Sequence, residues 1–245
     1  ERGYRVVLLA RGPERRRSAA AELGPGFAGA IELLPTDVDD AGACKAAIET
    51  VETRLGRIDW LITAAGTAEP GLFRDLDLAV HREQMQTNYF GTLQLIRAAV
   101  PLMRATGGRI TLVASGAAFL GIVGYSAYAP SKFAIRGLAE ILRLELAPDG
   151  IAVSVACPPD TQTPQLERER HKRPPVTRLI AEQGGVMSAR LVAERIINRA
   201  EAGAFLLAPS RPIALLARFH SLYGPFFARQ QQRLLRRLPA RRISE

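Results

Sequence analysis

The sequence predicts an α/β fold, a doubly wound parallel sheet with helices on both of its faces. Short apolar runs of strand length alternate along most of the chain with longer amphipathic stretches, as in successive βαβ units. The chain has 245 residues, of which 47% are hydrophobic, so it can bury a sizeable core. Strands joined by helices lie parallel in one sheet, because right-handed crossovers place the helices over its faces.

The strands are expected where apolar and β-branched residues follow one another. The first run is Tyr-Arg-Val-Val-Leu-Leu-Ala at residues 4–10, and the second covers residues 31–37. Further runs of this kind predict strands at residues 58–63, 109–114, 151–156 and 204–208.

Helices are expected in the stretches between these strands. An Ala-rich stretch at 14–23 follows the first strand, and the other helices are expected at 40–55, 81–106, 126–147 and 191–202. Pro158, Pro159 and Pro164 are expected to halt regular structure. The polar stretch 162–185 is therefore expected to form a flexible lid.

One constellation of polar residues points to a specific chemistry. Tyr128 and Lys132 are four positions apart, so on a helix they share a face, and the ammonium is expected to lower the pKa of the phenol towards neutrality. Ser115 follows the apolar run at 109–114, so its hydroxyl is expected at the carboxyl edge of the sheet, where open α/β sheets bind ligands. Such groups suit proton-coupled hydride transfer. The Tyr and Lys spacing by itself would indicate only a helical surface pair.

With Asn88 further upstream, this pattern resembles the short-chain dehydrogenase/reductase family. The resemblance implies a Rossmann-like fold and assigns the family's catalytic Asn, Ser, Tyr and Lys to Asn88, Ser115, Tyr128 and Lys132. In that assignment Tyr128 donates a proton to the forming alkoxide and Ser115 holds the carbonyl oxygen. Lys132 would bind the cofactor ribose, and the side chain of Asn88 would anchor a water next to Lys132.

The residues that close the first two strands indicate which dinucleotide is bound. A carboxylate at the end of the first strand would favour NADH, because it accepts hydrogen bonds from the ribose 2′-hydroxyl and repels a 2′-phosphate. That strand ends instead in Arg11, and Arg15 follows four positions later, so both are expected to bind the 2′-phosphate of NADPH. The alternative is a solvated basic turn. Asp37 and Val38 match the family's adenine-contacting positions, and Asp37 would also suit a helix cap.

Two further segments match the family's cofactor-binding loops with changes. Thr-Ala-Ala-Gly at 63–66 stands where the family has Asn-Asn-Ala-Gly, and its small residues still let the backbone approach the adenosine ribose. Pro-Pro-Asp-Thr at 158–161 stands where the family has a Pro-Gly stretch beside the nicotinamide. The second proline stiffens that turn and removes a donor. From these segments, cofactor contacts are expected from Ala64, Ala65, Gly66, Pro158 and Thr161.

The Gly-rich turn of this fold is missing from the sequence. It normally follows the first strand and places the pyrophosphate at a helix N-terminus. Here the chain opens on Glu-Arg-Gly, which reads as the end of that helix, and no G-x-x-x-G-x-G follows a strand. In the family the strand before this turn lies between the strands expected at 4–10 and 58–63. Its loss would leave buried backbone groups unpaired at a cost of roughly 1–3 kcal/mol each, so we expect the sequence to be part of a longer protein.

Longer segments narrow the resemblance to a subfamily. They cover residues 128–140 and the proline-rich stretches 158–164 and 172–180. The resemblance implies NADPH-dependent reduction of a long-chain keto-lipid, 3-ketodihydrosphingosine, to dihydrosphingosine in sphingolipid biosynthesis. The alternatives are reduction of another carbonyl substrate, such as a 3-oxoacyl thioester or a steroid, and a non-catalytic NADPH-binding role.

Composition and charge limit the other partners. The net charge of +9 is concentrated near residues 11–17, 168–173 and 229–242, which favours local anion sites over a nucleic-acid groove. Three scattered histidines and two cysteines lack metal-ligand spacing, so no metal is expected. The cysteine usage also predicts a reducing, cytoplasmic compartment.

We expect an N-terminally incomplete dinucleotide-binding catalytic domain over residues 1–209 and a basic amphipathic extension over residues 210–245. The apolar runs of the extension are too short to span a membrane but suit peripheral contact with an anionic, cytosolic leaflet. A helix pair that packs a dimer is the alternative, and a homo-oligomer is expected.

Overall fold

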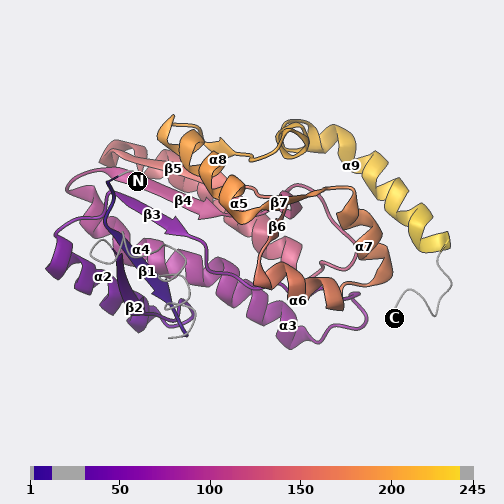
Figure 1. Ribbon diagram of the computed structural model, residues 1–245, viewed down its shortest axis with the longest axis horizontal. Helices are drawn as coiled ribbons and strands as arrows, with labels where there is room; N and C mark the ends of the chain where they lie inside the picture. Colours follow the sequence, from indigo (N-terminus) through magenta and orange to yellow (C-terminus); the bar gives the residue numbers. More distant parts are fainter. Residues whose placement is uncertain (1–2, 13–30, 238–245) are drawn as a thin grey trace.

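The computed structural model describes residues 3–12 and 31–237 (Figure 1). Its centre is a four-stranded parallel sheet in the order β3-β4-β5-β8. These strands are β3 (Trp60–Thr63), β4 (Gly108–Val113), β5 (Ile151–Ala156) and β8 (Leu206–Leu207). The predicted α/β fold and parallel strand direction are confirmed. The helix expected at 14–23, which contains Arg15, lies outside the described residues.

A second parallel sheet is formed by β1 (Val6–Ala10) and β2 (Ile31–Pro35). Within the described ranges no backbone ladder joins β1 to β3. Side chains meet between the two sheets, where the ring of Tyr4 packs edge-on against Trp60 with centroids 6.1 Å apart. The Trp60 indole Nε1 donates to Thr111 Oγ1 on β4 at 2.9 Å. The interruption falls where the sequence predicted a central strand to be missing.

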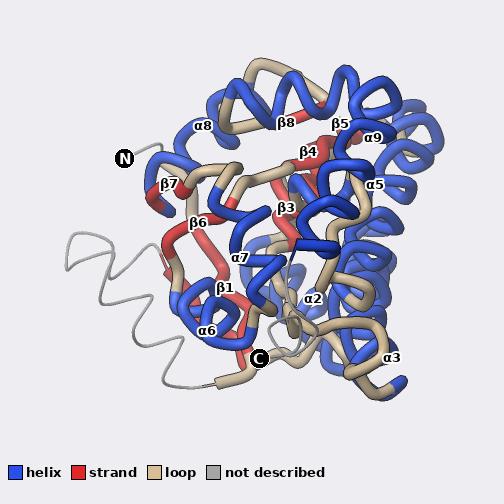
Figure 2. The backbone as a smooth tube through the Cα atoms, turned by 90° about the vertical axis from the view of Figure 1, so that its right-hand side faces the viewer, coloured by secondary structure: helices blue, strands red, loops and turns tan. Residues whose placement is uncertain are grey.

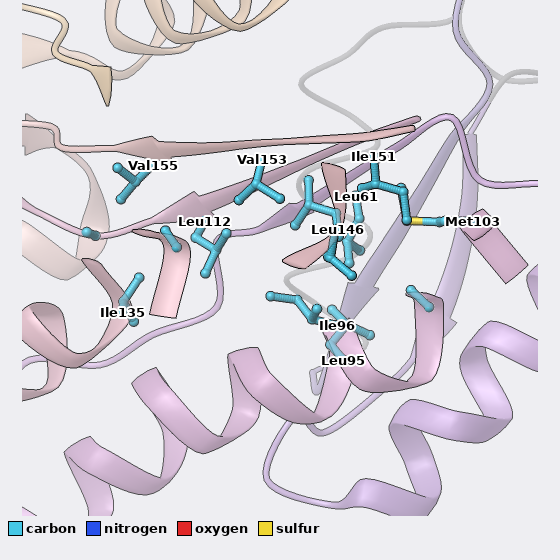
Figure 3. Packing of buried hydrophobic residues seen from close by; sticks show 14 of the residues in the cluster. Leu61, Leu95, Ile96, Met103, Leu112, Ile135, Leu146, Ile151, Val153 and Val155 are labelled. Carbon is cyan, nitrogen blue, oxygen red and sulfur yellow. The ribbon is translucent and has the colours of Figure 1, made fainter. Parts of the chain in front are cut away.

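Helices cover both faces of the larger sheet (Figures 1 and 2). On one face α4 (Gly91–Arg104) and α5 (Tyr128–Glu145) bury the main core, in which Leu112 and Val153 meet Ile96 and Ile135 (Figure 3). On the other face α8 (Ala189–Glu201) packs on a smaller cluster that includes Ala156. Alternate side chains of a strand point to opposite faces, which is why β5 serves both clusters.

The region predicted as one helix at 81–106 consists of three segments. α3 (Leu78–Met85) is followed by a π-helical turn, η2 (Gln86–Phe90), and then by α4. A side chain added at Gly91, directly after this turn, would lie 2.7 Å from Val38, so glycine lets the helix pack closely on that residue. α2 (Ala41–Leu55), which packs against α4, begins where the Asp40 carboxylate caps the amides of Gly42 and Ala43.

The stretch after β5 is more regular than predicted. It contains β6 (Asp160–Gln162), α6 (Pro164–Lys172), α7 (Pro175–Glu182) and β7 (Val186–Ser188), which lie beyond the carboxyl ends of the larger sheet (Figure 1). The expectation that Pro164 halts regular structure is wrong, because this residue occupies the first turn of α6, where its missing N–H costs nothing. Thr163 caps the same helix by accepting from the amide of Leu166 at 3.2 Å.

The short apolar segments of the C-terminal region belong to one kinked helix, α9 (Arg211–Arg237). The backbone departs from helical angles at Phe219, and Pro225 lies inside the helix. Ile213 joins the main core, and Gln231 is also buried. The helix therefore packs on the catalytic domain predicted for residues 1–209.

Candidate active site

A cavity of about 670 Å³ lies at the carboxyl ends of β4 and β5. Open parallel sheets bind their ligands at this edge. The cavity is lined by three of the predicted catalytic residues, Ser115, Tyr128 and Lys132, and by four predicted cofactor contacts, Ala64, Gly66, Pro158 and Thr161. Ala65, between two of these, is exposed to solvent.

Ser115 lies where β4 ends and a single 3-10 turn, η3 (Gly116–Ala118), begins. Its Oγ accepts a hydrogen bond from the amide of Ala117 at 3.1 Å, which fixes the side chain at the cavity wall. The amide of Gly116 donates to the carbonyl of Pro158 at 2.9 Å, so the turns after β4 and β5 are tied together. Ser115 lines the same cavity as Tyr128 and lowers the pKa of its phenol.

Tyr128 is the first residue of α5 and is partly buried. Burial raises its pKa above the ordinary value of 10, the charge of Glu169 raises it further, and the side chain of Ser115 lowers it. This direction is opposite to the one predicted from the Tyr and Lys spacing. Lys132, whose Nζ lies 5.7 Å from the Tyr128 ring centre, does not reverse the effect of burial. Tyr128 is therefore held as a neutral phenol, the form that donates a proton.

Lys132 lies one helical turn further along α5 and is 5% exposed. Its Nζ donates to the carbonyl oxygen of Val113 at 3.1 Å, at the end of β4. Burial lowers the pKa of Lys132 to about 8, while the charges of Cys157 and Glu169 act in the opposite direction. This lysine can consequently exchange protons near neutral pH.

Asn88 lies in the π-helical turn and is fully buried. Its Oδ1 accepts from the amide of Thr67 at 2.8 Å, and its Nδ2 donates to the Thr67 carbonyl at 3.0 Å and to Ser131 Oγ at 2.8 Å. Asn88 therefore ties the loop after β3 to the first turn of α5. Its role in anchoring a water stays a prediction.

Gly66 lies beside this clamp. A Cβ at this position would lie 3.0 Å from Asn88 Oδ1 and 3.5 Å from Lys132 Nζ. Only a residue without a side chain leaves room there. On the opposite turn Thr161 Oγ1 donates to the Pro159 carbonyl at 2.9 Å, which orients the hydroxyl at the cavity wall.

The residues predicted to bind the adenosine end lie at the ends of β1 and β2. The guanidinium of Arg11 lies 3.8 Å from a carboxylate oxygen of Asp37 and 3.9 Å from one of Asp39. The structure thus brings Arg11 and Asp37 together at one edge. Val38 is 8% exposed and belongs to the main core, so its side chain faces away from any ligand there and only its backbone is available.

Sequence reasoning missed a buried ionic group in the cavity wall. Asp160 and Glu169 line the cavity, and Arg173 pairs with both of them. The ring of Tyr125, which also lines the cavity, packs under the Arg173 guanidinium with its centre 5.7 Å away. The only available signal was the charge-rich segment 167–173 next to two prolines.

Residues 3–12 and 31–237 contain no group of three or more His, Cys, Asp or Glu side chains placed to hold a metal ion. They also contain no helix with both the length and the apolar character needed to cross a bilayer.

Residues 1–174 match the protein family described as short chain dehydrogenase. The chain belongs to this family. The matched range includes the four residues predicted to be catalytic, Asn88, Ser115, Tyr128 and Lys132.

Named relatives agree with this membership. The chain is 38% identical over 202 residues to a 3-ketodihydrosphingosine reductase of Dictyostelium discoideum, covering 80% of this chain and 60% of that protein. The chain spans between 50% and 63% of the length of three other curated relatives. A short-chain dehydrogenase of Streptomyces avermitilis has a similar structure, with a TM-score of 0.77, 25% identity, and coverage of 96% of this chain and 89% of that one.

A second solved structure that is similar to this chain contains bound ligands. The gluconate 5-dehydrogenase of Burkholderia cenocepacia, in complex with NADP and tartrate, has a TM-score of 0.61 and 26% identity. The alignment covers 67% of this chain and 64% of that one.

Proposed function

We propose that this short-chain dehydrogenase reduces a long-chain amino ketone, 3-ketodihydrosphingosine, to dihydrosphingosine at the expense of NADPH. One observation carries the proposal. Ser115 and Tyr128 line the wall of the same large cavity, with the buried Lys132 one helical turn from Tyr128. The similarity to curated 3-ketodihydrosphingosine reductases supports the choice of substrate.

The protein residues have separate roles in this reduction. Tyr128, kept neutral by burial, donates its proton to the substrate oxygen as the carbonyl is reduced. Ser115 donates a hydrogen bond to the same oxygen and stabilises the negative charge that develops on it. After Tyr128 has given up its proton, Lys132, whose pKa is lowered to about 8, would return a proton to it.

The residues around the cavity fit the nicotinamide half of a dinucleotide. Gly66 lets the backbone of this loop lie close to Asn88 and Lys132, and we place the ribose against this part of the cavity wall. Pro158 and Thr161 stand on the opposite side, where a carboxamide would meet them. When bound, the reduced dinucleotide supplies the hydride.

At the other end of the cofactor, Arg11 would bind the 2′-phosphate and Asp37 the adenine amine. The Arg11 guanidinium lies 3.8 Å and 3.9 Å from carboxylate oxygens of Asp37 and Asp39. A guanidinium can bind a doubly charged phosphate through two parallel hydrogen bonds, which favours NADPH over NADH. Arg15 is proposed for the same phosphate.

The far side of the cavity suits an alkyl chain. The apolar side chains that line it there come from the loop after η3 and from α9, and they include Leu120, Ile122, Leu216, Phe226 and Phe227. A long hydrocarbon chain buried against them would contribute about 0.8 kcal/mol for each methylene removed from water. A small polar ketone would make none of these contacts.

We further propose that α9 lodges on the cytosolic leaflet of a membrane. Tyr223 and Phe226 line the cavity while 47% and 63% of their surfaces are exposed, so the cavity reaches the surface at this helix. The same helix carries exposed arginines at 218, 229, 233, 236 and 237. Such a face suits an anionic leaflet, from which a lipid substrate could enter. A homo-oligomer stays a separate prediction, which sedimentation equilibrium would test.

The proposed reaction is tested by following NADPH oxidation with 3-ketodihydrosphingosine, a 3-oxoacyl thioester and a steroid ketone. The first compound should give the highest kcat/KM. Tyr128→Phe should lower turnover by about 10²- to 10⁴-fold and leave NADPH affinity unchanged. Tyr4→Phe, which removes a hydroxyl exposed far from the cavity, is the control. A higher kcat/KM with another ketone would identify that ketone as the substrate. Undiminished turnover in Tyr128→Phe would exclude the proposed mechanism.

A further inference from the structure

The ionic group in the cavity wall has an uneven distribution of charge. It contains two carboxylates, Asp160 on β6 and Glu169 on α6, and a single guanidinium, that of Arg173. Arg173 binds both oxygens of Asp160, at 2.6 Å and 3.0 Å. Its contact with Glu169 is longer, at 3.4 Å. The guanidinium is therefore committed mainly to Asp160.

The negative charge of Glu169 is less well compensated than that of Asp160. Its other oxygen accepts from the neutral amide of Gln165 at 3.0 Å, and the residue is 9% exposed. Burial raises the pKa of this carboxyl above its ordinary value, against the opposing effects of Gln165 and Arg173. The other cation that acts on it, Lys132, already donates to the Val113 carbonyl. A buried carboxylate in this position gains from a further cation.

Glu169 lines the same cavity as Ser115 and Tyr128. Its negative charge raises the pKa of the Tyr128 hydroxyl. Arg173 is 4% exposed and, unlike the two carboxylates, is not one of the residues that line the cavity. An occupant of the cavity therefore meets a carboxylate and not the guanidinium.

We propose that Glu169 binds the amino group of the substrate and thereby selects 2-amino ketones over ketones that lack this group. The inference rests on the proposed function, in which the ketone oxygen lies between Ser115 and Tyr128. In 3-ketodihydrosphingosine the amine is on the carbon next to that ketone, so it lies close to the reacting oxygen. Arg173 acts as a positioning residue, since it holds Asp160 and orients Glu169.

The test combines two ketones with two variants. The ketones are 3-ketodihydrosphingosine and the same molecule with hydrogen in place of the amino group. Glu169→Gln keeps the shape of the side chain and removes its charge, and Glu167→Gln, exposed on the same helix, is the matched control. Initial rates of NADPH oxidation give kcat/KM for each combination, and thermal unfolding checks that the variants fold.

Glu169→Gln should lose on the order of 10- to 100-fold in kcat/KM on the amino ketone, as for a hydrogen bond to a charged group, and stay within about twofold on the other ketone. Glu167→Gln should match the wild type on both. Glu169→Asp, which retains the charge, should keep part of the preference. An equal loss on both ketones would show that Glu169 only supports the fold of α6, and an unchanged preference would overturn the inference.

A binding measurement separates this inference from the proposed function. Calorimetry with dihydrosphingosine, the amine-bearing product, needs no turnover. If neither ketone is reduced by the wild type, the proposed reaction fails. The inference still stands if Glu169→Gln weakens dihydrosphingosine binding by 10-fold or more, and it falls if the two proteins bind this amine equally.

Discussion

The Oε1 atom of Gln231, near the end of α9, accepts a hydrogen bond from the backbone amide of Val123 at 2.8 Å. The Nε2 atom of the same side chain donates to the Gly121 carbonyl at 2.9 Å. One buried amide thus satisfies both a donor and an acceptor of the loop that follows η3. This loop contributes Leu120 and Ile122 to the cavity. The C-terminal helix therefore supports the substrate side of the site.

Replacement of Gln231 by Ala should destabilise the protein by about 1–3 kcal/mol, because two buried backbone groups lose their partners. Urea unfolding measures the change. Gln232→Ala, at the exposed neighbouring position, should be neutral. Equal midpoints for Gln231→Ala and the wild type would show that α9 is not held by this contact.

Gly66→Ala should impair the site, whereas Gly137→Ala should not. A Cβ at Gly66 would crowd Asn88 Oδ1 at 3.0 Å, but one at Gly137, inside α5, would meet no atom within 4 Å. Gly137→Ala should stabilise the helix by roughly 0.5–1 kcal/mol. Gly66→Ala should weaken NADPH binding at least about 10-fold, because a loss of roughly 1.4 kcal/mol in binding free energy lowers the affinity tenfold. Fluorescence titration with NADPH checks the result, and equal affinities in both variants would contradict it.

Because Lys132 is buried, the free energy of unfolding should change with pH in the alkaline range. Its pKa falls from 10.5 to about 8 in the folded chain, so between these values the unfolded chain binds more protons and stability rises with pH. Below pH 8 both forms are protonated, and the full cost of the buried charge persists. Compared with Lys132→Met, the wild type should gain on the order of 2–3 kcal/mol between pH 7.5 and pH 10.5. Urea unfolding of both proteins at each pH measures this difference, and a pH-independent difference would contradict the assigned shift.

The exposed apolar face of α9 should determine membrane binding. Leu215 and Leu222 are 53% and 66% exposed, and their joint replacement by Ser should reduce flotation with anionic liposomes by about 10-fold or more. Leu144→Ser, at a residue 71% exposed on α5, is the control for loss of an exposed leucine. Flotation of the double variant at the wild-type level would exclude this face as the contact.

The parts of the site that sequence reasoning predicted are those fixed by local structure. Tyr128 and Lys132 share a helix face, and Ser115 follows a buried strand, so short-range periodicity places them at one edge of the sheet. Their relative pKa values could not be predicted in the same way. Burial, a property of the whole fold, raises the pKa of Tyr128 and outweighs the spacing argument.

Other features depended on contacts between distant segments. In the π-helical turn, Asn88 is hydrogen-bonded to Thr67, 21 residues away. A helical pattern in the sequence does not predict a contact of this kind. The Asp160 and Arg173 pair joins two elements across the stretch that was expected to be a flexible lid. Pro164 was misjudged because a proline both ends and begins helices, and only the cap at Thr163 tells which.

Trp60 is the only tryptophan in the 245 residues of the chain. Its indole lies between the two sheets, in contact with Tyr4 on one side and hydrogen-bonded to Thr111 on the other. The intrinsic tryptophan emission of this protein is consequently a single-site signal. Any event that alters how the β1–β2 pair sits against β3 changes the surroundings of that one fluorophore, so the sequence carries its own spectroscopic reporter at the boundary between its sheets.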